Sequence, residues 1–85
     1  MQLNLDKAKK VSNYAFSGCN SLTSIIIGNS VKSIGDYAFY DCNLLTSVVI
    51  PNSVTSIGES AFSSCLWLAR VVIGDNVTSI GDGAF

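Results

Sequence analysis

The stretch LTSVVIPNSVTSIGESAFSSC (residues 45–65) recurs along this chain with substitutions. Its Ala-Phe pair stands at residues 15–16, 38–39, 61–62 and 84–85, always 23 residues after the previous one. A fixed period of about 20–50 residues is the signature of a solenoid or array, in which each repeat is one structural unit. We therefore expect a single domain, 1–85, made of a degenerate N-terminal unit 1–14, repeats 15–37, 38–60 and 61–83, and the start of a further repeat at 84–85.

Each repeat contains a short apolar run that predicts a strand, because β-branched residues favour extended backbone. Alternation places Ile25 and Ile27 on one face of the strand and Ile26 on the other. Gly or Pro ends the strand, a polar turn follows, and a Val-x-x-Ile-Gly segment comes next. The Ala-Phe-x-x-Cys segment then returns the chain to the next strand. It is too short for a stable helix, so we expect a helical or 3₁₀ turn there.

One such unit cannot bury its own apolar side, whereas stacked units bury a continuous core. The fold class predicted is mostly β: a leucine-rich-repeat solenoid with a parallel concave sheet and short helical or 3₁₀ return turns. Leu3 and Leu5 supply a further strand if the register slips by one residue.

Composition limits the classes of partner. The chain is 48% hydrophobic and 13% charged, with a net charge of −1, so nothing in it indicates nucleic acid or an acidic membrane. No apolar run approaches the roughly 18 residues of a membrane helix, so we expect no membrane insertion. The first ten residues hold no unbroken apolar stretch, so we expect no signal peptide in this chain.

The pattern Leu-x-x-Val-x-Ile-Pro-x-x-Val-x-x-Ile-Gly-x-x-Ala-Phe-x-x-Cys resembles the BspA-like (Treponema-type) leucine-rich repeats, and the resemblance covers residues 11–85. It implies a curved solenoid of the kind found in bacterial and some protozoan surface proteins, secreted or at the cell surface. Some members resemble adhesins that bind host matrix proteins or other cell-surface proteins. Family proteins usually carry more repeats and a secretion or anchoring segment.

Two columns of chemically active residues repeat with the period. Cys19, Cys42 and Cys65 invite a metal or redox interpretation, but the chain has no His and no Cys-x-x-Cys pair, so a buried, reduced column of thiols is favoured. Asp36, Glu59 and Asp82 follow the turn glycines. Calcium is one interpretation of these carboxylates, and capping of the turn that starts there is the favoured one. We expect no metal and no cofactor.

The residues predicted to contact a protein partner are apolar or basic and near the strands: Ile26, Val49, Val72, Arg70, Leu44, Leu66 and Trp67. The first three form a stripe on the outer strand face, which strand propensity alone also explains. Leu66 and Trp67 stand where the first unit has the polar residues Asn20 and Ser21, and Trp is a favoured interface anchor. Local shielding of the core edge is the alternative for them.

Without His, and with its cysteines buried, the chain assembles no catalytic triad or acid–base pair at a defined spacing, so we expect no enzyme. The favoured function is a protein-binding or adhesion module that uses its concave face. The alternative is a structural self-assembly unit that associates through open solenoid ends, since the chain stops at Ala84-Phe85 within a return segment.

Overall fold

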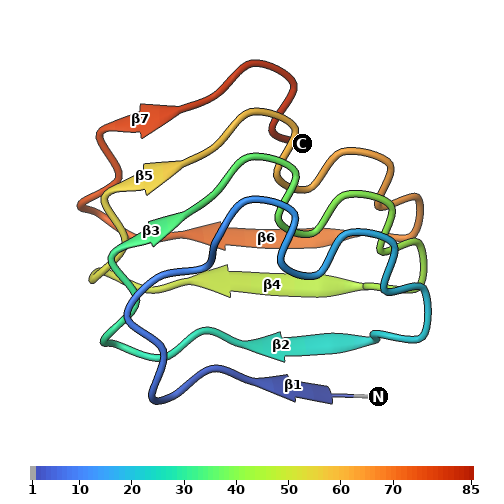
Figure 1. Ribbon diagram of the computed structural model, residues 1–85, viewed down its shortest axis with the longest axis horizontal. Coiled ribbons are helices and arrows are strands. Elements are labelled where there is room, and N and C mark those ends of the chain that lie inside the picture. The colour runs from blue at the N-terminus through green and yellow to red at the C-terminus, as the bar shows by residue number, and fades with distance from the viewer. Residues whose placement is uncertain (1) are drawn as a thin grey trace.

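The computed structural model describes residues 2–85, so Met1 of the predicted N-terminal unit lies outside the described residues. The chain winds into coils stacked one on another, and equivalent strands of successive coils lie side by side (Figure 1). The strands are β1 (Gln2–Asn4), β2 (Ser24–Ile26), β3 (Ser33–Ile34), β4 (Ser47–Ile50), β5 (Ser56–Ile57), β6 (Arg70–Ile73) and β7 (Ser79–Ile80).

The strands form two parallel sheets along the stack, as Figure 1 shows. The first sheet has the order β1-β2-β4-β6 and contains the predicted strands. The second, β3-β5-β7, was not predicted: the last two residues of each Val-x-x-Ile segment pair with the equivalent residues of the next coil, as Ile34 does with Ile57. The solenoid is therefore held together along two sides of each coil.

The first strand confirms the slipped register. Leu3 pairs with Ile25, 22 residues later, whereas Val11 bridges Ile34 at the full interval of 23. The slip keeps Leu3 at the register position of Ile25, and Leu3 packs against the core. The first coil is one residue shorter than the next, and the missing residue falls between Asn4 and Val11.

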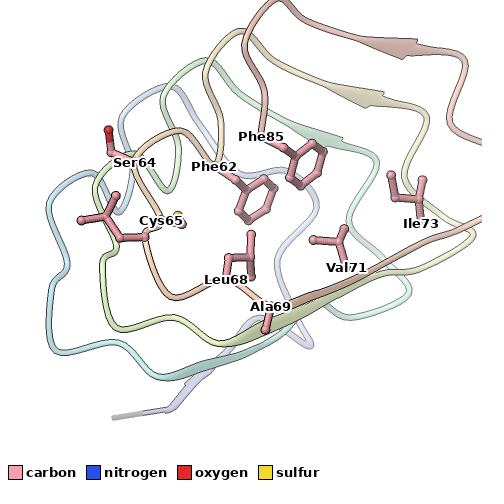
Figure 2. Close-up of a pocket in the computed structure, with 9 residues that line it drawn as sticks. Phe62, Ser64, Cys65, Leu68, Ala69, Val71, Ile73 and Phe85 are labelled. Carbon is pink, nitrogen blue, oxygen red and sulfur yellow. The ribbon is translucent and has the colours of Figure 1, made fainter.

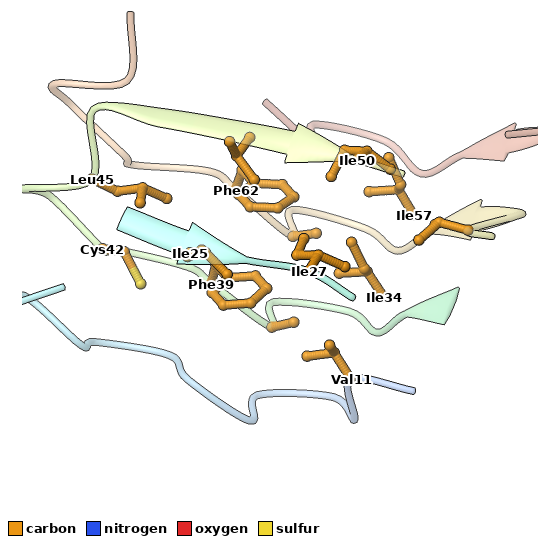
Figure 3. Packing of buried hydrophobic residues seen from close by; sticks show 14 of the residues in the cluster. Val11, Ile25, Ile27, Ile34, Phe39, Cys42, Leu45, Ile50, Ile57 and Phe62 are labelled. Carbon is orange, nitrogen blue, oxygen red and sulfur yellow. The ribbon is translucent and has the colours of Figure 1, made fainter. Parts of the chain in front are cut away.

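The core runs through the centre of the coils, and the alternation predicted for the strands is confirmed. Ile25 and Ile27 are 8% and 7% exposed, while Ile26 between them is 41% exposed. Phe39 and Phe62 are buried and stack with their rings 5.1 Å apart. Figure 3 shows equivalent side chains of neighbouring coils packed against each other: Ile34 with Ile57, and Phe39 with Phe62.

The prediction of helical or 3₁₀ return turns is wrong: residues 2–85 contain no helix, and hence none able to span a membrane. Each complete return segment holds two residues with positive φ, such as Tyr37 (58°) and Asp41 (61°). A left-handed residue cannot continue a right-handed helix. The chain instead makes consecutive tight turns and bonds to the next coil, as the Phe39 N–H does to the Ala61 carbonyl at 2.8 Å.

Candidate functional site

The outward face of the first sheet carries a column of apolar side chains. Ile26, Val49 and Val72 are 41%, 54% and 49% exposed, and Val49 pairs directly with Val72. Beside this column runs a row that begins with serines and ends with Arg70, which pairs with Ser47. We call Ile26, Val49, Val72 and Arg70 the outer face. The fold brings these four predicted residues together on one surface.

The other three predicted residues lie just before the strands, and the fold divides them. Leu44 and Trp67 occupy equivalent positions in successive coils and are both exposed, Trp67 by 68%. Leu66 is exposed too, but it lines a recess in the last coil that Trp67 does not line. Of these two residues, adjacent in sequence, only Leu66 lines the recess.

The recess has a volume of about 480 Å³ and opens between the last return segment and strand β6 (Figure 2). Its walls are apolar, with Phe62 beneath and Leu68, Val71 and Phe85 around it. Core positions that are closed in the middle coil are open here. Phe85, for example, is 49% exposed, whereas Phe62, the equivalent residue one coil earlier, is 1% exposed. The surface of the last coil in this chain thus has the composition of the core. We call it the last-coil face, defined by Leu68, Val71, Ile73, Val77, Ile80 and Phe85.

The cysteine column is buried only at its centre. Cys42 has a coil on either side and is fully buried, whereas Cys19 and Cys65 are half-buried, so the prediction that all three are buried is wrong for the outer two. All three are free thiols. The Cys42 thiol donates to the Phe16 carbonyl at 3.3 Å, and burial raises its pKa to about 11. Burial also raises the pKa of Cys65. A fully buried thiol with a raised pKa is a packing group rather than a nucleophile, and this describes Cys42.

Within the acidic column, Asp36 joins two coils instead of capping its own turn. The Asp36 carboxylate accepts the backbone N–H of Glu59 at 2.8 Å, and Asn13 accepts that of Asp36 at the same distance. The predicted acceptor role is therefore confirmed for Asp36, but the donor belongs to the next coil. Among the described residues, no group of three or more His, Cys, Asp or Glu is placed to hold a metal ion.

One surface was not predicted from the sequence. Tyr14, Tyr37 and Tyr40 lie together on the return segments, with Tyr14 and Tyr37 stacked at 5.1 Å. The sequence held a signal for this surface: Tyr14 and Tyr37 are one period apart, and the three tyrosines of the cluster are all the tyrosines of the chain.

Both the sequence and the structure of this chain are similar to those of known leucine-rich repeat proteins. The family model described as "BspA type Leucine rich repeat region (6 copies)" matches residues 2–85. A crystal structure of the T. pallidum leucine-rich repeat protein is similar, with a TM-score of 0.78 and 31% sequence identity over 89% of this chain. The match spans 46% of that protein, so the chain corresponds to about half its length. No curated protein matches the sequence significantly. With nearly the whole chain matched by the family model, this protein belongs to the BspA-type leucine-rich repeat family.

Proposed function

We propose that this chain is a non-catalytic protein-binding module of a cell-surface or secreted protein, and that it binds through the outer face of its first sheet. The observation that carries the proposal is the column Ile26, Val49 and Val72, in which every member is more than two-fifths exposed. Exposed apolar side chains that form a continuous patch, rather than scattered single residues, mark contact surfaces on soluble proteins.

Departures from the repeat concentrate near this column. Arg70 stands where the two preceding coils have Ser24 and Ser47, and Trp67 stands where the first has Ser21. Arg and Trp are the residue types enriched at the energetic centres of protein interfaces. The change from serine to Arg70, together with the bulky Trp67 in the same coil, supports a contact centred on β6. Because the chain belongs to this family, some of whose members resemble adhesins, we take a host-matrix or other cell-surface protein as the partner to test.

The test uses variants that restore the repeat. Leu66→Asn, Trp67→Ser and Arg70→Ser each install the residue found at the same position of an earlier coil, so the fold should be retained. We expect the wild-type chain to bind at least one of a panel of immobilised extracellular-matrix proteins, and the triple variant to lose most of that binding. Val49→Ser, in the centre of the column, should weaken it further. Binding that the triple variant and Val49→Ser both retain would contradict the proposal.

A second candidate function is self-association of the 85-residue chain. It is supported by the last-coil face, where Ile73 and Ile80 are 41% and 50% exposed, while their equivalents Ile50 and Ile57 are buried. A second copy that covers this face would bury a surface with the composition of the core. This function predicts a mass in solution above the 9.0 kDa of one chain, in the absence of any other partner.

A further inference from the structure

All three tyrosines of the chain gather on the return segments, away from the first sheet. The rings of Tyr14 and Tyr37 stack with 3° between their planes, and Tyr40 meets Tyr37 edge to face at 5.4 Å. Tyr14 and Tyr40 are exposed, Tyr14 by 61%. The three rings therefore form one continuous aromatic surface, which we call the tyrosine cluster.

The repeat does not need tyrosine at these positions. Tyr14 and Tyr37 adopt positive φ (61° and 58°), a conformation that bulky side chains seldom adopt. The next two coils place Ser60 and Gly83 there, also with positive φ. The position of Tyr40 is held by serine in both neighbouring coils, at Ser17 and Ser63. Small residues build the same turns, so the rings add a surface that the backbone alone does not require.

Carboxylates stand next to two of the three tyrosines. Asp36 precedes Tyr37 and Asp41 follows Tyr40, and the Tyr37 hydroxyl donates to the Glu59 carboxylate at 3.4 Å. Residues 33–69, which hold Tyr37 and Tyr40, include these three carboxylates and no Lys or Arg; the lysines nearest Tyr14 in sequence are Lys9 and Lys10. The face of an aromatic ring attracts cations, and a nearby carboxylate strengthens that attraction. The local chemistry is thus that of a surface for positively charged groups.

We propose that the tyrosine cluster is a second contact surface, which binds an arginine-bearing segment of a partner protein. Arginine fits both features, because its planar guanidinium stacks on aromatic rings and donates paired hydrogen bonds to a carboxylate. Lysine offers only a point charge and is bound more weakly at such a surface. The proposal does not depend on the outer face, which lies on the first sheet.

The experiment titrates the whole 85-residue chain with a short Gly-Arg repeat peptide, followed by NMR of the tyrosine ring protons. Gly-Lys and Gly-Glu peptides of equal length are the controls. The variant Tyr14→Ser/Tyr37→Ser/Tyr40→Ser carries at each position a serine that the repeat has in another coil. Asp36→Asn removes a charge but keeps the oxygen that accepts the Glu59 N–H. Leu66→Asn/Trp67→Ser is the matched control, because it changes only residues just before strand β6.

We expect saturable shifts of the tyrosine rings with the arginine peptide, weaker ones with the lysine peptide and none with the glutamate peptide. The tyrosine variant should remain folded and lose roughly fivefold or more in affinity, the effect of two or more exposed cation–π contacts. Asp36→Asn should weaken binding, and Leu66→Asn/Trp67→Ser should leave it unchanged. Unshifted tyrosine rings, or a tyrosine variant that binds the arginine peptide as the wild type does, would overturn the proposal. A tyrosine variant with a markedly lower melting temperature would also overturn it, since the rings would then be structural.

Discussion

At the scale of single residues, the central cysteine is the group whose chemistry the fold changes most. Burial raises the pKa of Cys42 from 9.0 to about 11, so at pH 8 its thiolate fraction is roughly a hundredfold below that of an unperturbed thiol. We predict that native Cys42 reacts with iodoacetamide at least that much more slowly than it does in urea. Peptide mass spectrometry after a short pulse measures the rate at each cysteine. Native labelling of Cys42 as fast as that of the half-buried Cys19 would be inconsistent with the buried column.

The same pKa shift has a consequence for stability. Because the folded pKa lies above the unfolded one, the stabilisation from the neutral thiol is fully present below about pH 9 and is lost as the pH rises through about 11. Cys42→Ala removes this ionisation. The difference in free energy of unfolding between wild type and Cys42→Ala should therefore shrink from pH 8 to pH 11.

At the scale of the elements, the second sheet depends on how closely successive coils approach. A Cβ added at Gly58 would lie 2.5 Å from the backbone nitrogen of Asp36, in the coil before, so that backbone must shift. We predict that Gly58→Ala lowers the free energy of unfolding by about 3 kcal/mol, the upper range for overpacking. Gly18→Ala is the matched control. Its Cβ meets nothing within 4 Å but its φ is +76°, so it should cost about 1 kcal/mol.

Urea unfolding followed by circular dichroism measures both glycine variants. Equal losses at the two positions would mean that backbone conformation, rather than contact between coils, requires these glycines. A smaller loss at Gly58 than at Gly18 would show that the coils are less tightly apposed than the structure has them.

These elements also show which parts of the structure are visible in the sequence. Alternation around Ile26 places the outer face correctly, because in a strand every second side chain points the same way. The second sheet has strands of two residues, too short for any alternation to appear. The left-handed backbone at Tyr37 was also invisible, since tyrosine does not signal positive φ. Leu66 and Trp67 stand in a turn, where no period relates neighbouring side chains, so only the structure shows that Leu66 lines the recess and Trp67 does not.

At the scale of the whole molecule, the last-coil face decides how the isolated chain behaves in solution. Full burial of one large apolar side chain contributes about 1.5–3 kcal/mol, and the six residues of this face are all partly or largely exposed. The burial free energy that these six side chains lack is, in sum, comparable with the entire stability of a domain, about 5–15 kcal/mol. A second copy covering the face recovers part of it. We therefore predict that the 85-residue chain self-associates through its last coil, with Trp67 close to the contact.

Light scattering over a dilution series measures this association, and two neighbouring residues of β6 provide a matched pair of variants. Val71 lines the recess and Val72 points outward, so the same substitution tests opposite faces of one strand. Val71→Lys should give monomers of 9.0 kDa, because it places a charge where a partner must pack, while Val72→Lys should still associate. Trp67→Ser should weaken association without abolishing it, since Trp67 does not line the recess. The opposite result, with Val72→Lys monomeric and Val71→Lys associated, would move the contact to the outer face. A wild-type chain that stays monomeric at the highest concentration would remove self-association altogether and leave the outer face to a different protein.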